Sequence, residues 1–137
     1  MARILVIDDD QAVRLTIRLV LERAGHEVML AENGQQGVQL FGDDEFDLLI
    51  VDIFMPGMDG LETMRDIHRL RPGVPVVVIS GYAFRTPLET VPDFLRMAEK
   101  LGAVRTLRKP FKPAELLSIV ADGLDRSPDR AQVSETG

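Results

Sequence analysis

Chemically versatile side chains stand directly after four short apolar runs of the sequence. In chain order they are Asp8, Asp9 and Asp10 after residues 4–7, Asp52 after 48–51, Ser80 after 76–79, and Lys109 with Pro110 after 105–108. If these runs are parallel strands of one sheet, their carboxyl ends meet at one edge, where open α/β sheets bind ligands. The spacing therefore predicts one site that combines carboxylates, a hydroxyl group and an ammonium group.

A divalent metal ion is the simplest partner for such crowded carboxylates. Neighbouring carboxylates repel one another, and their pKa values rise unless a cation joins them. The chain has no cysteine, and neither of its two histidines, His26 and His68, falls at a predicted strand end. Oxygen ligands alone suit a hard ion, and a site open to water and phosphate oxygens suits Mg²⁺ better than Ca²⁺. We therefore expect Mg²⁺ to bind here.

Asp52 is the candidate nucleophile of this site. It stands alone at the end of an apolar run, where its carboxylate can attack phosphorus and form an aspartyl phosphate. Mg²⁺ and Lys109 would then neutralise the transferred group, and Ser80 would donate a hydrogen bond to it. Taken singly, these residues have ordinary structural explanations: aspartates cap helices, which is the role we expect for Asp10, and an exposed lysine is commonplace. Their joint placement at four strand ends favours phosphoryl chemistry.

The elements that must position these side chains alternate along the chain. Strand-like apolar runs span 3–7, 26–31, 46–51 and 74–79, with a weaker one near 105–108, and three of them are continuous, as in parallel strands covered on both faces. Segments of helical period span 11–24, 35–41, 61–70, 92 or 93–101, and 113–124; the first follows Asp10 and ends at Gly25. The pattern predicts a flavodoxin-like α/β fold, a doubly wound five-stranded parallel sheet of order 2-1-3-4-5 with helices on both faces.

Length and composition indicate one globular domain. The 137 residues include 45% hydrophobic and 28% charged residues, and the net charge of −6 argues against direct nucleic acid binding. No apolar run approaches the roughly 18 residues of a membrane span, so we expect no membrane contact. The lack of cysteine fits a cytoplasmic location. We assign residues 1–124 to the domain and expect the polar tail 125–137 to be disordered.

Rival phosphate-binding folds are disfavoured by their motifs. Neither G-x-x-x-x-G-K-[ST] nor G-x-G-x-x-G follows a strand, which argues against P-loop and Rossmann nucleotide sites. The acidic turn after the first strand disfavours a flavodoxin-type flavin phosphate site. A haloacid-dehalogenase-like phosphatase would carry D-x-D-x-T there, but Asp8 and Asp10 are followed by Ala12 at the place of the hydroxyl residue.

Five stretches of the sequence carry a family resemblance. They are I-L-V-I-D-D-D (4–10), D-L-L-I-V-D-I-F-M-P-G-M-D-G (47–60), V-V-V-I-S-G-Y (76–82), L-G-A (101–103) and K-P-F (109–111). In this order and at these strand ends, they resemble the receiver domain of two-component response regulators. The resemblance implies that a histidine kinase or a histidine phosphotransfer protein phosphorylates Asp52. The chain would then switch its protein contacts and catalyse only its own phosphorylation and dephosphorylation.

The resemblance also implies the ligands of the metal ion and further partners. Asp9 would bind Mg²⁺ directly and Asp8 mainly through water, with Asp52 and the backbone carbonyl of Phe54 as further ligands. An unidentified downstream protein would read the switch, and a homodimer is a candidate assembly. No DNA-binding or enzymatic output domain follows the predicted receiver, so we expect the chain to act by protein contact or to be part of a longer protein.

The switch itself is expected to depart from the family pattern. Ser80 and Lys109 would hold the phosphoryl oxygens and draw the following loop inward, and the peptide bond between Lys109 and Pro110 would be cis. The family's switch aromatic normally stands three residues before the lysine, where this chain has Thr106. The segment between Ser80 and Gly102 is longer than usual by about two helical turns.

Two aromatic residues of that longer segment are candidates for the missing switch residue. Tyr82 or Phe84 would replace it, although both rings have packing as an equally good explanation. Phe54 and Tyr82 would also shield the acyl phosphate from water, so that dephosphorylation is slow. Two alternatives to the phosphorylation switch stay open: a Mg²⁺-dependent phosphohydrolase that uses the same carboxylates, and a receiver that binds its partners without phosphorylation.

Overall fold

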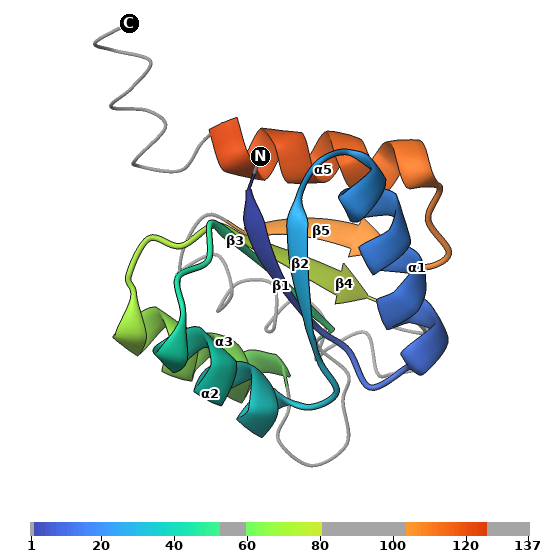
Figure 1. Cartoon of the computed structure of the whole chain (residues 1–137). Helices are drawn as coiled ribbons and strands as arrows, with labels where there is room; N and C mark the ends of the chain where they lie inside the picture. The colour runs from blue at the N-terminus through green and yellow to red at the C-terminus, as the bar shows by residue number, and fades with distance from the viewer. Residues whose placement is uncertain (1, 53–59, 81–103, 126–137) are drawn as a thin grey trace, which may run out of the picture.

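The computed structural model describes residues 2–52, 60–80 and 104–125, which form a parallel sheet flanked by helices (Figure 1). The strands are β1 (Arg3–Ile7), β2 (Glu27–Ala31), β3 (Leu48–Asp52), β4 (Val76–Ser80) and β5 (Val104–Arg108). They pair in the order β2-β1-β3-β4-β5, and every pair is parallel. The predicted fold class and strand order are therefore confirmed.

Helices cover both faces of this sheet. The helices α1 (Gln11–Arg23) and α5 (Pro113–Asp125) lie on one face, and α2 (Gly34–Asp43) and α3 (Gly60–Leu70) lie on the other (Figure 1). Asp125, which the sequence analysis assigned to the tail, is the last residue of α5. The helix predicted over 92 or 93–101 and tail residues 126–137 lie outside the described residues.

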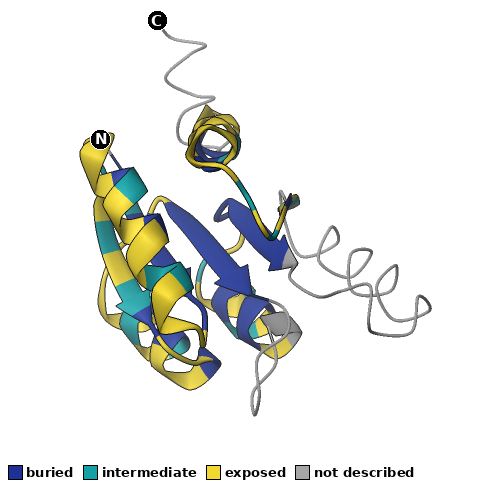
Figure 2. Cartoon of the chain, turned by 90° about the vertical axis from the view of Figure 1, so that its right-hand side faces the viewer, coloured by how far each residue is buried: buried dark blue, intermediate teal, exposed yellow. Residues whose placement is uncertain are grey.

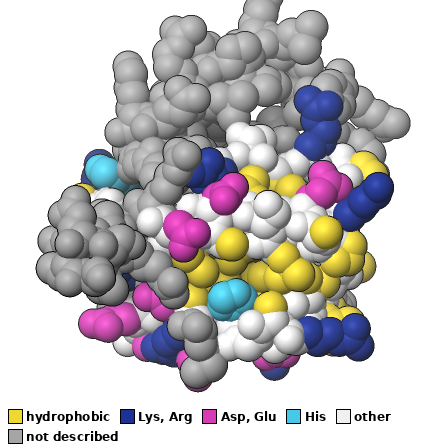
Figure 3. Space-filling model, turned by 90° about the horizontal axis from the view of Figure 1, so that it is seen from above, with side chains coloured by type: hydrophobic (Ala, Val, Ile, Leu, Met, Phe, Trp, Pro, Cys, Tyr) yellow, Lys and Arg dark blue, Asp and Glu magenta, His cyan; other side chains and the backbone are white. Residues whose placement is uncertain are grey.

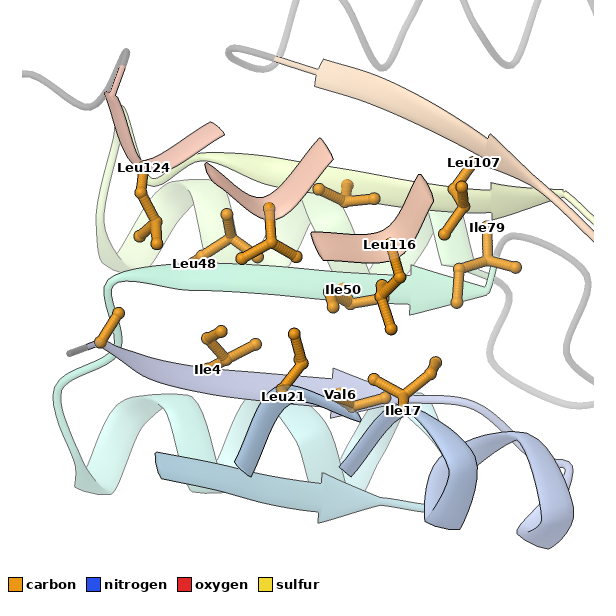
Figure 4. Close-up of a cluster of buried hydrophobic side chains, with 13 residues drawn as sticks. Ile4, Val6, Ile17, Leu21, Leu48, Ile50, Ile79, Leu107, Leu116 and Leu124 are labelled. Carbon is orange, nitrogen blue, oxygen red and sulfur yellow. The ribbon is translucent and has the colours of Figure 1, made fainter. Parts of the chain in front are cut away.

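The central strands are buried because both of their faces are covered, as Figure 2 shows. β3 is buried along its whole length, and its successive side chains point to opposite faces of the sheet. Ile50 belongs to a cluster with Ile17 of α1 and Leu116 of α5 (Figure 4). Leu49 belongs to a second cluster with Ile67 of α3. Two hydrophobic cores therefore hold the sheet from both sides and fix the positions of its strand ends.

The helix α1 begins where the sequence predicts and ends one residue earlier than predicted. The Asp10 side chain caps its first turn and accepts hydrogen bonds from the backbone N–H groups of Ala12 and Val13. The helix ends at Arg23, and Gly25 follows with φ of 93°, a left-handed conformation that glycine adopts without steric cost. The first turn of α1 is thus fixed next to the carboxyl end of β1, because the helix begins at Gln11, shortly after the strand ends at Ile7.

Hydrophobic side chains are also found on the outside of the molecule. Figure 3 shows a band of them among charged side chains on the side where α5 lies. The large hydrophobic side chains exposed among the described residues are Leu15, Leu19, Met29, Leu70 and Leu117. Residues four apart share a helix face, so Leu15 and Leu19 form an exposed apolar stripe on α1. No helix in the described ranges has both the length and the hydrophobicity needed to cross a membrane.

Candidate functional site

Three carboxylates converge at the carboxyl edge of the sheet. Asp8 directly follows β1, Asp52 ends β3, and the strand register places Ile7 beside Val51. One oxygen atom from each of Asp8, Asp9 and Asp52 lies within 4.8 Å of the other two. Asp8 and Asp52 are buried, whereas Asp9 is exposed. The structure thus brings together three of the carboxylates that the sequence analysis singled out.

Lys109 supplies positive charge to this acidic cluster. Its Nζ atom donates a hydrogen bond to Asp52 Oδ2 at 3.4 Å and lies 3.2 Å from Asp8 Oδ2, which makes an ion pair without hydrogen-bond geometry. Burial lowers the pKa of the Lys109 ammonium, but the Asp52 and Asp8 carboxylates outweigh burial, and the pKa is raised overall. Lys109 is therefore charged, and it bridges two carboxylates at the ends of different strands.

Asp8 is held in place by hydrogen bonds to three of its four polar atoms. Its backbone N–H donates to the Ala31 carbonyl at 3.1 Å, its Oδ1 accepts from the Asp10 N–H at 2.9 Å, and its carbonyl accepts from Arg14 Nη1 at 2.6 Å. The fourth atom, Oδ2, is buried and accepts no hydrogen bond within the described ranges. Burial raises the pKa of Asp8, and the Asp10 N–H and Lys109 only partly oppose this effect.

The donor set of the cluster fits a hard divalent cation. Three carboxylates face one ammonium group, so negative charge is in excess. Asp8 Oδ2 is buried and is paired with the Lys109 ammonium group but accepts no hydrogen bond, so it gains a further partner when a cation or its bound water approaches it. Oxygen ligands with one exposed member, Asp9, suit Mg²⁺, which retains several of its waters in proteins. The Phe54 carbonyl, expected as a further ligand, lies outside the described residues.

The ends of β4 and β5 lie next to each other at the same edge of the sheet. Ser80 is the last residue of β4, and its backbone pairs with Arg108, the last residue of β5. Lys109 follows Arg108 directly, so the backbone of Ser80 lies close to the chain that carries the ammonium group. The peptide bond between Lys109 and Pro110 is cis.

The predicted switch residues are only partly described. Thr106 is exposed in β5, and together with Glu115 of α5 it lines a shallow hollow between the two elements. Tyr82 and Phe84 lie outside the described residues, so their roles stay predictions. Asp10 is exposed and caps α1, the structural role expected for it.

Arg14 belongs to this region of the molecule, although the sequence analysis gave it no role. It lies in the first turn of α1, half-buried, and its guanidinium reaches back to the carbonyl of Asp8. The signal that identifies it is its spacing: a long cationic side chain four residues after the capping Asp10, in a helix that directly follows an acidic strand end.

Comparison with known families and proteins identifies several relatives of this chain. The family model described as "Response regulator receiver domain" matches residues 4–121. The sensory/regulatory protein RpfC of Xanthomonas campestris pv. campestris is 34% identical over 124 residues, which cover 88% of this chain and 16% of RpfC. The DNA-binding transcriptional regulator NtrC of Azospirillum brasilense is 34% identical over 137 residues, which cover 99% of this chain and 27% of NtrC. The chain thus spans less than a third of the length of either relative.

Solved structures of similar proteins share the fold. A CheY-like response regulator receiver domain protein from Methanospirillum hungatei superimposes with a TM-score of 0.80 and 32% identity, over 91% of this chain and 94% of that one. NtrX from Brucella abortus, solved in complex with ADP, gives a TM-score of 0.83 and 29% identity, over 99% of this chain but only 30% of NtrX. The likeness therefore extends over nearly the whole of this chain and over one part of longer regulators.

Proposed function

Because this chain belongs to the family of response regulator receiver domains, we propose that it is a phosphorylation switch in which Asp52 accepts the phosphoryl group. The phosphodonor is a histidine of a histidine kinase or of a histidine phosphotransfer protein. The observation that supports this proposal best is the acidic cluster at the edge of the sheet. Asp52 shares the cluster with Asp8 and Asp9, and Lys109 Nζ lies 3.4 Å from Asp52 Oδ2.

The transfer step is a displacement at phosphorus. A carboxylate oxygen of Asp52 attacks the phosphorus atom of the phosphohistidine. The new P–O bond forms as the P–N bond breaks, and the electron pair of the broken bond stays on the imidazole nitrogen. Lys109 already contacts Asp52 Oδ2, so its ammonium group is close enough to neutralise the transferred phosphoryl oxygens. We assign Ser80, at the neighbouring strand end, as a hydrogen-bond donor to the same group.

We assign the metal site to Asp8, Asp9 and Asp52, together with the backbone carbonyl of Phe54. When bound there, Mg²⁺ supplies positive charge against the carboxylates and the phosphoryl oxygens. Asp9, which is exposed, would hold the ion directly, and Asp8, which is buried, would act mainly through water. The excess of negative charge over the single ammonium group of Lys109 supports this assignment.

The switch needs an aromatic partner other than residue 106. Thr106 has no ring and is exposed, so we assign this role to Tyr82 or Phe84. We also assign to Phe54 and Tyr82 the shielding of the acyl phosphate from water, which makes dephosphorylation slow. Comparing the phosphorylated and free forms of Tyr82→Ala and Phe84→Ala tests the switch. Unchanged switching in both variants rejects this assignment, and unchanged hydrolysis with small residues at 54 and 82 rejects the shielding.

The phosphodonor protein needs a surface on which to dock near Asp52. Leu15 and Leu19 of α1 are about half exposed, at 49% and 52%, and α1 starts directly behind the acidic strand end. We assign this stripe to the phosphodonor protein. We expect Leu15→Ser with Leu19→Ser to slow transfer from that protein by about tenfold or more, the effect of losing a contact worth at least 1.4 kcal/mol. Labelling by a small phosphodonor should be unchanged, and equal slowing of both reactions contradicts the assignment.

The first experiment is intact mass spectrometry after incubation with acetyl phosphate and Mg²⁺. We expect one phosphoryl adduct, which is absent in Asp52→Asn and in wild type treated with EDTA. Release of phosphate over many turnovers would instead favour the phosphohydrolase. A folded protein without any adduct or phosphate release, and with partner binding unaffected by Asp52→Asn, would favour a receiver that acts without phosphorylation.

A further inference from the structure

The two peptide groups that flank Asp9 are each held by a side chain. Before Asp9, the Asp8 carbonyl accepts a hydrogen bond from Arg14 Nη1 at 2.6 Å. After it, the Asp10 N–H donates to Asp8 Oδ1 at 2.9 Å. The Asp9 side chain is exposed, and an exposed side chain has few packing restraints of its own. The orientation of the Asp9 side chain relative to the backbone therefore depends on these two hydrogen bonds.

Arg14 is itself fixed firmly enough to hold a peptide group. Its backbone N–H donates to the Asp10 carbonyl at 3.0 Å, a hydrogen bond of the first turn of α1. The Asp10 side chain closes the same turn by accepting from the Ala12 N–H at 2.9 Å. Arg14 is half-buried, so part of its side chain packs against the protein. The acidic loop and the first turn of α1 thus form one connected hydrogen-bonded unit, in which Arg14 links the helix back to Asp8.

We propose that Arg14 is a positioning residue of the Mg²⁺ site, which it serves by fixing the peptide group between Asp8 and Asp9. This inference rests on the proposed function, because it takes Asp8 and Asp9 as the residues that hold the ion. Residues that hydrogen-bond to metal ligands without contacting the metal commonly contribute to its binding, and their removal weakens metal affinity by about 10-fold to 100-fold. Arg14 acts on the ligands through a backbone carbonyl and keeps its own charge outside the ligand set.

Positioning and charge predict opposite effects of removing Arg14. The guanidinium is a cation beside a site for a cation, so as a charge alone it repels Mg²⁺, and its removal tightens binding. As a hydrogen-bond donor it holds the Asp8 carbonyl, and its removal lets the Asp9 backbone reorient, which weakens binding. The sign of the change in affinity therefore separates the two roles.

The test is isothermal titration calorimetry of MgCl₂ into wild type, Arg14→Met, Arg14→Lys and Arg18→Met, each checked for folding by circular dichroism. Arg18→Met is the matched control, because Arg18 is exposed one turn further along α1 and pairs with Glu22 at 3.3 Å. We expect the Kd of Arg14→Met for Mg²⁺ to rise about tenfold. We expect Arg14→Lys, which keeps the charge on a shorter side chain, to fall between wild type and Arg14→Met, and Arg18→Met to match wild type.

Affinity that is unchanged or tighter in Arg14→Met overturns the proposal. If Arg14→Met does not fold, Arg14→Lys decides alone: weaker binding than wild type supports positioning, and wild-type affinity overturns it. Absence of Mg²⁺ binding in wild type would be a failure of the proposed function instead. Wild-type binding with unaffected Arg14 variants would leave the proposed function standing and reject only the role of Arg14.

Discussion

Replacing Lys109 by methionine removes the ammonium group that contacts Asp8 and Asp52 but keeps an unbranched apolar side chain. At an effective dielectric constant of about 20, each contact, at 3.2 Å and 3.4 Å, corresponds to about 5 kcal/mol of gross attraction. Desolvation of the ammonium group offsets much of this, and breaking a buried ion pair typically costs about 3–5 kcal/mol. The Lys109 side chain is 20% exposed. We therefore expect a loss near the lower end, about 3 kcal/mol of unfolding free energy without divalent metal.

Thermal unfolding followed by circular dichroism in EDTA measures this loss. For a domain of this size, about 3 kcal/mol lowers the Tm by about 10 °C. Lys112→Met is the matched control, because Lys112 is exposed and its loss removes the same charge; we expect a change within about 0.5 kcal/mol. Mg²⁺ should raise the Tm of Lys109→Met by more than that of wild type, since it supplies the missing positive charge. A Lys109→Met protein as stable as wild type in EDTA would refute the reasoning, because desolvation would then cancel the attraction.

Two further predictions concern the scaffold around the site. A Cβ added at Gly37 of α2 would lie 2.7 Å from Ile7 Cγ1, so we expect Gly37→Ala to lower the free energy of unfolding by about 1–2 kcal/mol. Gly42→Ala in the same helix meets no such clash, and we expect it to raise the free energy of unfolding by about 0.5–1 kcal/mol. Urea unfolding of both variants measures these changes, and equal effects would contradict the prediction. The hydrogen bonds from Arg3, one of them at 2.7 Å, lower the pKa of Asp44 below its usual 3.8. The pair of Arg3 and Asp44 therefore stabilises the fold fully above pH 3.8, and this stabilisation is lost as the pH falls through the lowered pKa. Urea unfolding across pH should therefore show wild type more stable than Asp44→Asn near neutrality, with the difference vanishing in acid; a difference that persists there would contradict the prediction.

The fold was predictable because burial and pairing coincide for most of each strand. They separate at the starts of β3 and β4, which the sequence analysis placed two residues too early. Phe46 was assigned to the third strand, but it lies before β3 and packs on Phe41, with ring centroids 6.0 Å apart. Val74 and Pro75 are buried before β4 begins. Pro75 has no N–H to donate to a neighbouring strand, so only its carbonyl bonds, to the Leu49 N–H at 3.0 Å. Apolar character therefore predicts which residues are buried better than it predicts the residue at which strand pairing begins.

The convergence of the site residues was predictable for a topological reason, and their contacts were not. Parallel strands end at one edge, so Asp8 and Asp52 had to approach each other once the strand order was known. The sequence did not indicate that the Lys109 ammonium would lie between Asp8 and Asp52, because that depends on the path of a side chain. It did not indicate the contact of Arg14 either: the spacing of Arg14 after Asp10 is visible in the sequence, but whether its guanidinium reaches the Asp8 carbonyl again depends on the path of a side chain.

Lys109 and Arg14 contact Asp8 on different sides, and this gives them opposite effects on metal binding. The ammonium group of Lys109 lies 3.2 Å from Asp8 Oδ2, where it competes with a metal cation for space and for the negative charge of the carboxylate. The guanidinium of Arg14 lies 2.6 Å from the Asp8 carbonyl and holds the ligand backbone instead. Both side chains are cations, so a purely electrostatic account predicts that removing either one tightens Mg²⁺ binding. We expect tighter binding only in Lys109→Met and weaker binding in Arg14→Met, and calorimetric titrations in which both variants bind Mg²⁺ more tightly than wild type would show that charge alone governs this site.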